Sequence, residues 1–446
     1  MANPDRVGVS LQAAPMTPYR VTAFFLCVLV AVIDGFDFVA IGVAAPLLTA
    51  ELRLSVPQLG AVLALTQVGA AMGALGLGKA ADRFGRKTII VLSLLLIALF
   101  TGLTPLAGRF ATLLVIRFLA GVALAGVLAP AIALVSELAP ARRQATLVGL
   151  VVAGLPLGAA IGSLGGAELA QAFGWRSIFA LGAGLALAVA VLVWRALPES
   201  PRYLALADNT GRRLASTLRR LAPQVDAARL WEPLPGVRRD ASVNSTRGPR
   251  DGLFQGDLAR TSVMLVILLF CSGVLSNVML VWMPTILTRG GVDFAFAARV
   301  VGAVNIGSVV GMVIAGRALE IFGPRRTLGV AFCAAAGLTL SLGLQSGEVA
   351  SLATGAALGV FLGATTSAGY ALASLVYPSE IRSTGVGLGT AALRVGTVCA
   401  PLIMPVLIGL DVSKAWTLAL LALLPLCAGL LAAGFRQGQR LAATGR

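Results

Sequence analysis

Residues 78–87 read Gly-Lys-Ala-Ala-Asp-Arg-Phe-Gly-Arg-Lys, and residues 316–326 read Gly-Arg-Ala-Leu-Glu-Ile-Phe-Gly-Pro-Arg-Arg. Each charged segment separates two long apolar stretches, and the two segments lie 238 residues apart. Further residues of the two halves match at the same offset without a gap: Pro140 with Pro378, Gly149 with Gly387, Leu155 with Leu393, and Gly158 with Gly396. Chance can explain one matching pair of residues, but not a series of pairs at the same offset. We therefore predict an internal repeat of parallel type, with two six-helix bundles that can rock about a central site.

The composition indicates a chain that lies largely in a membrane. Of its 446 residues, 58% are hydrophobic and 12% are charged, whereas about 25% of the residues of a soluble domain are charged. About 20 apolar residues span a bilayer, and the sequence contains twelve stretches of this kind. They cover residues 20–49, 57–78, 88–107, 111–138, 145–171, 176–196, 261–288, 296–318, 327–345, 350–376, 384–409 and 415–435. The predicted fold class is all-α integral membrane, because many of the 52 glycines lie inside these stretches and favour close helix packing over a β-barrel.

Lys and Arg residues predict the orientation of the spans. Segments on the same side as the N-terminus contain 27 of the 35, the opposite loops contain six, and two, Arg117 and Arg394, fall inside spans. The positive-inside rule therefore places both termini in the cytoplasm, as an even number of spans also requires. We expect a multi-pass protein of the bacterial cytoplasmic (inner) membrane, without a removable signal peptide. Its net charge of +16 would then face anionic lipid headgroups rather than nucleic acid.

One polar segment, residues 197–260, divides the spans six and six. It is rich in Arg and contains six prolines, so we predict an N-terminal bundle over 1–196, a cytoplasmic linker over 197–260 and a C-terminal bundle over 261–446. Within the linker, residues 212–221 place three leucines on one helical face and four arginines elsewhere. This pattern predicts an amphipathic helix on the inner membrane surface, and we expect the remainder of the linker to be mobile.

The residues that the chain lacks exclude several kinds of chemistry. Histidine is absent, which removes His general bases, His-containing catalytic triads and His-ligated metals. The five cysteines lie singly in apolar stretches without CxxC spacing, so we expect small buried side chains rather than a redox or metal site. The sequence has no Gly-Lys-Ser/Thr nucleotide-binding loop, so ATP is not the expected energy source. We expect no enzyme activity, no metal and no cofactor.

The segment at 78–87, between the second and third spans of a twelve-span chain, resembles the signature of the major facilitator superfamily. The Pro-Glu-Ser-Pro-Arg sequence at 198–202 is similar to that of its sugar-porter-like branch. Asp34-Gly-Phe-Asp37 in the first span resembles the Asp-Gly-x-Asp motif of the aromatic acid:proton symporters. Four further segments resemble that family: 117–121, 137–143, 378–385 and 394–396. The resemblance covers nearly the whole chain apart from the linker and the termini, and it implies a transporter of acids such as benzoate or hydroxybenzoate.

Two acidic residues in the first span are the candidate proton-coupling groups. Asp34 and Asp37 are three residues apart and share a helix face, about 20–25 Å from the inner end of the span. A charge at this depth is costly, and burial and mutual repulsion favour the neutral form of at least one carboxyl group. Arg117 enters the fourth span at a similar depth, so an Asp–Arg pair that protonation breaks can form. The alternative is a static ion pair that only holds the helices together.

Arg394, about 16 Å into the eleventh span from the inside, is the first candidate ligand for a substrate carboxylate. A guanidinium group is always charged and binds a carboxylate with two parallel hydrogen bonds. The alternative is an ion pair between Arg394 and an acidic residue of another helix. The ring of an aromatic substrate needs apolar or aromatic walls with a few polar groups. Six further midspan residues are candidates, although helix packing explains each equally well: Phe36, Gln67, Asn277, Trp282, Asn305 and Tyr370.

Charged and glycine residues at the inner ends of spans are the candidate gating residues. They are Gly78, Asp82, Arg83, Gly85, Arg86, Lys87, Glu137 and Arg143 in the first half, and Glu320, Arg325, Arg326, Glu380 and Arg382 in the second. Cations suit helix C-termini and the acids can pair across bundles, so we expect an ionic latch of the outward-facing state that breaks in the transition. Charges that only set the topology are the alternative. Pro324 replaces Arg86 in the second copy, which predicts a weaker latch there.

Together these features predict a secondary active transporter that imports a small aromatic carboxylate, of the benzoate or hydroxybenzoate type, by proton symport with alternating access. Its expected partners are this substrate, protons and the lipid bilayer, and we expect a monomer that serves the catabolism of aromatic compounds. The nearest alternative is a proton-coupled carrier of a non-aromatic acid such as muconate or a dicarboxylate. An exporter of cationic drugs is a second alternative, although Arg117 and Arg394 would repel a cation. A receptor would need a larger signalling domain than residues 197–260.

Overall fold

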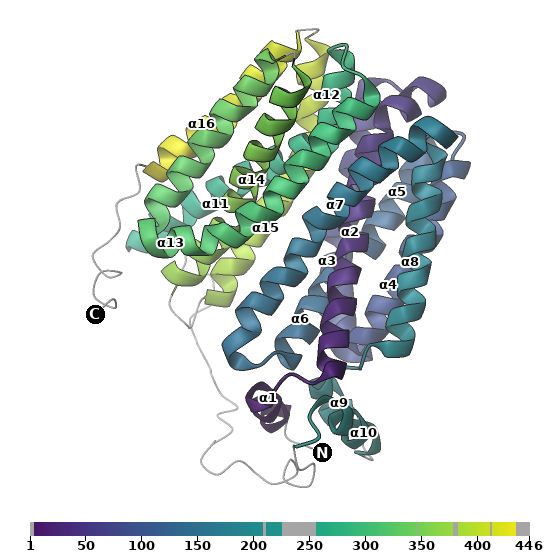
Figure 1. Cartoon of the computed structure of the whole chain (residues 1–446), viewed down its shortest axis with the longest axis vertical. Coiled ribbons are helices and arrows are strands. Elements are labelled where there is room, and N and C mark those ends of the chain that lie inside the picture. Colours follow the sequence, from purple (N-terminus) through teal and green to yellow (C-terminus); the bar gives the residue numbers. More distant parts are fainter. Residues whose placement is uncertain are drawn as a thin grey trace. The chain divides into compact units, whose positions relative to one another are not determined.

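A computed structural model describes residues 4–207, 211–224, 256–345, 347–377, 382–410 and 413–433, and every regular element in these ranges is helical (Figure 1). Up to residue 224 the elements are α1 (Pro4–Ala13), α2 (Pro18–Leu52), α3 (Val56–Phe84), α4 (Arg86–Leu103), η1 (Thr104–Leu106), α5 (Phe110–Leu124), α6 (Leu128–Leu138), η2 (Ala141–Arg143), α7 (Gln144–Phe173), α8 (Arg176–Ala196), α9 (Pro201–Ala207) and α10 (Arg212–Leu221). From residue 256 they are α11 (Gly256–Asn277), η4 (Val278–Trp282), α12 (Met283–Arg289), α13 (Phe294–Leu344), α14 (Glu348–Val376), α15 (Arg382–Gly409) and α16 (Lys414–Ala433).

Eleven helices in the described residues are long and apolar enough to cross a membrane. One of them, α13, has 51 residues and at 1.5 Å per residue measures about 76 Å, more than twice the ~30 Å of a hydrocarbon core. Its backbone turns at Gly323, where φ is 74°, a value that glycine adopts readily because it has no Cβ. The predicted spans 296–318 and 327–345 are therefore both present, joined without a loop. The twelve predicted crossings fit these eleven helices.

Most of the other predicted spans agree with the helices to within a few residues, and two of them are interrupted. The span 111–138 breaks between α5 and α6, where an added Cβ on Gly126 would lie 2.0 Å from the hydroxyl oxygen of Ser93. The span 261–288 contains the π-helical turn η4, followed by Pro284 near the start of α12. Proline has no N–H, and its ring conflicts with the carbonyl group one turn earlier. This conflict accounts for the wider turn.

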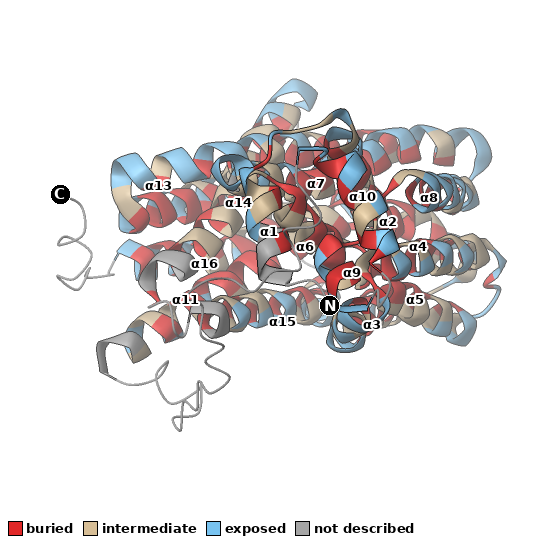
Figure 2. Ribbon diagram, turned by 90° about the horizontal axis from the view of Figure 1, so that it is seen from below, coloured by how far each residue is buried: buried red, intermediate tan, exposed pale blue. Residues whose placement is uncertain are grey.

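Large apolar side chains cover the outward surfaces of the helices. Phe25, Leu75, Val313 and Leu430 are each more than 60% exposed. Figure 2 shows exposed residues along α8 and α13, with buried residues on the sides that meet neighbouring helices. Soluble proteins rarely expose apolar surface on this scale, whereas lipid chains cover it without cost. The surface is that of an integral membrane protein.

Close contacts divide the described chain into two compact units. Unit 1 comprises the described parts of Met1–Phe38, Val68–Gly158 and Arg176–Ser242, and unit 2 those of Val39–Gln67, Ala159–Trp175 and Val243–Arg446. Within unit 2, an added Cβ on Gly42 of α2 would lie 2.6 Å from the carbonyl oxygen of Val281 in η4. An added Cβ on Gly60 of α3 would lie 2.5 Å from the carbonyl oxygen of Pro401 in α15. Unit 2 therefore joins the later parts of α2 and the earlier part of α3 to the helices that follow residue 256.

The two halves of the chain make matching backbone contacts at the same 238-residue offset. An added Cβ on Gly35 would lie 1.9 Å from the carbonyl oxygen of Leu155, and the corresponding distance from Gly273 to Leu393 is 2.2 Å. Helices α2 and α7, which lie side by side in Figure 1, thus pack backbone to backbone as α11 and α15 do. The other contacts that recur are Gly158–Val32 with Gly396–Phe270, Gly69–Phe118 with Gly307–Ala356, and Gly73–Val122 with Gly311–Val360. The predicted repeat is confirmed at the level of individual contacts.

Helix α10 forms over the predicted range 212–221, but its surroundings differ from the prediction. Leu214, Leu218 and Leu221 are buried in an apolar cluster that also contains residues of α1, α2 and α9. Figure 2 shows buried and exposed residues alternating around this helix. The prediction that the leucine face lies on the membrane surface is wrong, because protein already covers it. Most of the segment expected to be mobile, residues 225–255, lies outside the described residues.

Helix α1 was not predicted, and besides its apolar contacts a single cation links it to the bundle by hydrogen bonds. Arg20, 1% exposed, donates hydrogen bonds to the carbonyl groups of Leu11, Ala14 and Pro15 and to that of Leu138. These carbonyls lie at or just beyond the ends of α1 and α6, where helix dipoles favour a positive charge. Arg20 therefore joins α1, α2 and α6, besides contributing to the charge that sets the topology.

The contact between α2 and α7 predicts opposite outcomes for two glycines of α7. Gly158→Ala forces a methyl group against the carbonyl of Val32, and overpacking of this kind costs about 1–3 kcal/mol. Gly149 has nothing within 4 Å of an added Cβ among the described residues, so Gly149→Ala gains helix propensity of up to about 1 kcal/mol. Thermal unfolding of the purified protein in detergent should give a lower Tm for Gly158→Ala and an unchanged or higher Tm for Gly149→Ala. Equal Tm values for the two variants would contradict this packing.

Candidate functional site

A buried ion pair joins α2 to α5. Nη2 of Arg117 lies 3.1 Å from Oδ2 of Asp37, and the two side chains are 0% and 2% exposed. The other carboxylate oxygen, Oδ1, accepts a hydrogen bond of 2.6 Å from the hydroxyl group of Thr101 in α4. The guanidinium group lies 5.8 Å from the ring centre of Phe179 in α8, which is within cation–π range. The expected contact between an aspartate of the first span and the arginine of the fourth is present.

Each charge of this buried pair depends on the other for compensation. Removing one partner of a buried ion pair costs about 3–5 kcal/mol, because the remaining charge has no compensation. Nε and Nη1 of Arg117 have no hydrogen-bond partner among the described residues, so the guanidinium group has room for another acceptor. Asp34, one turn before Asp37, is half-buried and has interactions of its own.

Close helix packing positions these groups. The ring of Phe36, 2% exposed, lies against α8, where an added Cβ on Gly182 would be 2.9 Å from a ring carbon. This approach brings α8 close to α2 and places Phe179, one turn before Gly182, beside Arg117. Phe36, predicted to contact substrate, is thus buried against α8 and directly precedes Asp37 in the sequence.

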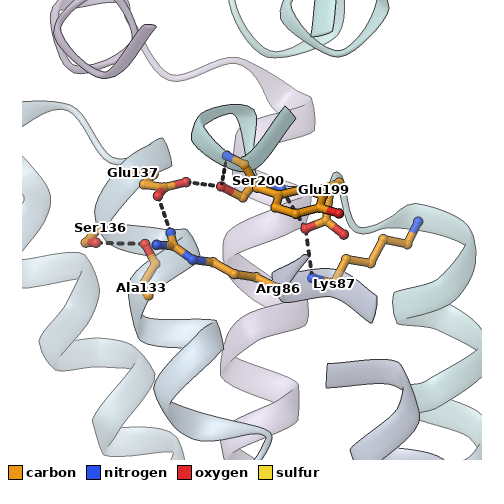
Figure 3. A network of polar contacts seen from close by, with 8 residues as sticks. Arg86, Lys87, Ala133, Ser136, Glu137, Glu199 and Ser200 are labelled. Atoms are coloured by element: carbon orange, nitrogen blue, oxygen red, sulfur yellow. Dashed lines mark hydrogen bonds and ion pairs between the residues drawn. The ribbon is translucent and has the colours of Figure 1, made fainter. Parts of the chain in front are cut away.

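A second polar network connects the starts of α4 and α9 with the end of α6 (Figure 3). Arg86 and Glu137 form an ion pair, with side chains 16% and 11% exposed. The hydroxyl group of Ser200 donates to the second oxygen of Glu137 at 2.5 Å. Glu199 accepts from the backbone N–H groups of Lys87 at 3.0 Å and of Ser200 at 2.9 Å. The segments 78–87 and 198–202 therefore form one site.

Gly85 is required in this network for two separate reasons. Its φ is 97°, a backbone conformation that side chains disfavour. An added Cβ would also lie 2.4 Å from Oε2 of Glu199. Gly85 thus lets the Glu199 carboxylate approach the first backbone N–H groups of α4, where the helix dipole favours an anion.

Most of the other predicted gating residues do not join this network. Gly78 is half-buried, with nothing within 4 Å of an added Cβ among the described residues. The following predicted residues are exposed: Asp82, Arg83, Arg143, Arg325 and Arg326.

The second copy of the motif shows a local pair in place of the network. Glu320 pairs with Arg317, one turn away on the same helix, at 2.8 Å, and the side chains are 68% and 76% exposed. Arg382 begins α15, but its side chain is outside the described set, and Glu380 lies wholly outside the described residues.

Two predicted substrate residues lie together in unit 2. Arg394 of α15 is exposed and forms no ion pair with a described residue. Tyr370 of α14 is half-buried. Its hydroxyl group forms a hydrogen bond with Thr390 and interacts electrostatically with the guanidinium group of Arg394. Gln67 is half-buried at the edge of the unit 2 part of α3. Pairing with an acid, the alternative explanation of Arg394, finds no support in the described residues.

Several buried polar groups without described partners lie in η4, beside it, or on α13, a helix that packs against it. Both amide atoms of Asn277, Nε1 of Trp282, Oγ1 of Thr285 and Oδ1 of Asn305 have no hydrogen-bond partner among the described residues. All four side chains are at most 6% exposed, and α13, which carries Asn305, packs against η4. An unsatisfied buried polar group costs about 1–3 kcal/mol, and π-helical turns occur frequently at functional sites. This region can supply donors and acceptors to a polar ligand.

Sequence reasoning missed five residues of these sites. Thr101 carried a usable signal, since it is a polar residue of the third span about 22 Å from its inner end, at the depth of Asp37. Phe179 and Thr285 resemble many other span residues, and only packing distinguishes them. Glu199 and Ser200 were noticed within a motif, but their contacts with Lys87 and Glu137, 112 and 63 residues away, could not be read from spacing.

Comparisons with known proteins agree with one another. The family model described as Major Facilitator Superfamily matches residues 27–347 and 265–441. The 4-hydroxybenzoate transporter PcaK of Pseudomonas aeruginosa is 32% identical over 406 residues, which cover 91% of this chain and 90% of that protein. A gallate transporter of Pseudomonas putida is 30% identical, with 96% of this chain and 94% of that protein covered. The crystal structure of a D-xylose-proton symporter has a similar fold, with a TM-score of 0.74 at 18% identity over 95% of this chain and 99% of that chain.

The two charged networks predict different responses to loss of an acid. Glu137→Gln leaves Arg86 without its partner in a mostly buried site and should lower stability by roughly 1–3 kcal/mol. Glu320→Gln removes an exposed pair of the same kind, and such pairs are worth about 0–1 kcal/mol. Thermal unfolding in detergent should therefore show a clear decrease in Tm for Glu137→Gln only. An unchanged Tm for Glu137→Gln would show that this network does not stabilise the protein.

Proposed function

Because the chain belongs to the major facilitator superfamily, and is therefore a transporter rather than an enzyme, we propose that it imports a small aromatic carboxylate by proton symport with alternating access. The observation that carries the proposal is the buried ion pair between Asp37 and Arg117. A buried carboxylate that can exchange a guanidinium partner for a proton supplies the chemistry of a proton-coupled carrier.

In the proposed cycle, Asp37 takes up a proton when the site is open to the outside. The neutral carboxyl group releases Arg117, and release of the proton to the cytoplasm restores the ion pair. Asp34, on the same helix face, is the second proposed proton-binding group. A monovalent carboxylate that moves with one proton carries no net charge. Each further proton would couple transport to the membrane potential, by about 2.3 kcal/mol per charge per 100 mV.

Arg394 is the proposed ligand of the substrate carboxylate. It is exposed and has no ion pair with a described residue, so its guanidinium group can form two parallel hydrogen bonds to a carboxylate. Tyr370, beside it, offers an aromatic face and a hydroxyl group. The names of the relatives, a 4-hydroxybenzoate transporter and a gallate transporter, favour an aromatic acid over muconate or another non-aromatic acid.

The unpartnered polar groups around η4 are the proposed contacts for ring substituents. Asn277 offers both a donor and an acceptor, Trp282 a donor, Thr285 both, and Asn305 an acceptor. A ring hydroxyl group donates one hydrogen bond and accepts others, so it matches this set. An unsubstituted ring would leave these groups unsatisfied, which disfavours it.

The proposed setting is a bacterial cytoplasmic membrane with both termini in the cytoplasm. The excess of Lys and Arg on the N-terminal side supports this orientation. In this orientation the network of Arg86, Glu137 and Ser200 lies at the cytoplasmic end, where an ionic latch is expected. The bundles over 1–196 and 261–446 are the proposed moving parts, in a carrier proposed to act as a monomer.

Uptake measurements in proteoliposomes test the proposal. A panel of labelled benzoates, hydroxybenzoates and non-aromatic acids is supplied with an inward proton gradient, with and without a protonophore. We expect accumulation of an aromatic acid that the protonophore abolishes. Asp37→Asn, which mimics the protonated side chain, should abolish accumulation but retain exchange of labelled for unlabelled substrate. Asp293→Asn is the matched control, because Asp293 caps α13 and Asn caps a helix equally well. Accumulation by Asp37→Asn at the normal level would contradict the proposal.

A further inference from the structure

Thr101 of α4 differs from Thr66 and Thr104, two other buried threonines, in the direction of its hydroxyl group. Thr66 and Thr104 donate to the carbonyl group one turn earlier in their own helix, at 2.9 Å and 3.0 Å. Thr101 instead donates to Oδ1 of Asp37 at 2.6 Å. Its side chain is 0% exposed, so water does not compete for this bond.

The internal repeat provides a comparison within the same chain. Thr339 occupies the position of Thr101 in the second copy, at the 238-residue offset, and is also 0% exposed. The position of Asp37 is there occupied by Leu275. The hydroxyl group of Thr339 bonds the carbonyl of Ala335 in its own helix at 2.7 Å. The threonine thus turns away from its own helix in the copy where a carboxylate faces it.

Packing of α8 fixes the direction of the Thr101 side chain. An added Cβ on Gly182 would lie 3.5 Å from Cγ2 of Thr101. The methyl group therefore faces α8, and the hydroxyl group is directed at α2. The two oxygens of Asp37 are occupied separately, Oδ1 by Thr101 and Oδ2 by Arg117.

We propose that Thr101 is a positioning residue for the proton-coupling carboxylate: it holds Oδ1 so that Oδ2 faces Arg117, and it sets the pH at which Asp37 exchanges Arg117 for a proton. The incoming proton binds Oδ2, and the hydrogen bond from Nη2 of Arg117 to that oxygen breaks. A hydroxyl donor stabilises a carboxylate in its ionised form. This inference rests on the proposed proton symport.

The other charged groups that face Asp37 are few. Arg117 approaches from α5, and Asp34 lies one turn away on α2 itself. In their described residues, α4, α7 and α8 carry ionisable Arg, Lys or Glu side chains only toward their ends: Arg86, Lys87, Glu168, Arg176 and Arg195. The pH response at this depth therefore depends on Asp37, Arg117 and Asp34, with Thr101 as the neutral hydrogen-bond donor.

The pH profile of proton-driven uptake in proteoliposomes tests the inference. Thr101→Val keeps the shape of the side chain but removes the donor, so the ionised form of Asp37 loses stabilisation and the proton binds at lower proton concentration. The midpoint of the profile should move up by about one to two pH units, the equivalent of one hydrogen bond to a charged group. Thr101→Ser restores the donor and should restore the midpoint. Thr339→Val, the counterpart in the second copy, should leave it unchanged.

A combined variant separates this role from a structural one. In an Asp37→Asn background, measured by substrate exchange, Thr101→Val should cause no further change in the pH profile, because the group it acts on is gone. Identical midpoints for Thr101→Val and Thr101→Ser, with intact proton-driven uptake, would overturn the role of Thr101 and leave the proposed symport standing. Absence of proton-driven uptake in the unmodified protein would overturn the symport itself. If Thr101→Val does not reach the membrane, Thr101→Ala replaces it with the same expected shift.

Discussion

A carboxylate that has been removed from water has to be compensated by its neighbours, and around Asp37 three neighbouring helices take part in this. Arg117 supplies the opposite charge from α5, Thr101 supplies a hydroxyl donor from α4, and Phe179 of α8 lies under the guanidinium group. Close packing contributes to this arrangement, since Phe179 lies one turn before Gly182, where α8 approaches α2. Glycine at Gly35 and Gly182 lets α7 and α8 approach α2, so the packing and the charge arrangement depend on each other.

The internal repeat preserves this packing but not this chemistry. The glycine contacts between α2 and α7 recur between α11 and α15. The distances from an added Cβ to the nearest carbonyl oxygen agree to within about 0.4 Å. The charged groups do not recur, since Leu275 stands at the position of Asp37 and Gly355 at that of Arg117. The C-terminal copy instead carries the exposed Arg394 and the unpartnered polar groups around η4. In our account, proton binding is assigned to the first copy and most of the substrate contacts to the second.

The sequence predicted those features that depend on spacing and on solvent. The 238-residue offset matched Gly158 with Gly396, and both glycines make the same kind of backbone contact. The depths of Asp34, Asp37 and Arg117 predicted that an aspartate of the first span can pair with Arg117, and the structure shows that this aspartate is Asp37. The leucine face of α10 led to the prediction of a helix on the membrane surface, whereas protein covers this face, because lipid and protein favour the same amphipathic pattern. Similarly, nothing local to Glu199 indicates that its carboxylate would meet the start of α4. Contacts of this kind are set by the tertiary fold, which one sequence does not specify by spacing alone.

Asp37 is proposed to change its protonation state during transport, and infrared difference spectroscopy of the purified protein can follow this change. A protonated carboxyl group has a C=O stretching band well separated from the bands of a carboxylate. Titration over the working pH range should reveal such a band, and Asp37→Asn should remove it. The account predicts that the band grows as the pH falls and that saturating substrate alters its midpoint. A carboxylate that stays ionised over the whole range, with and without substrate, would contradict it.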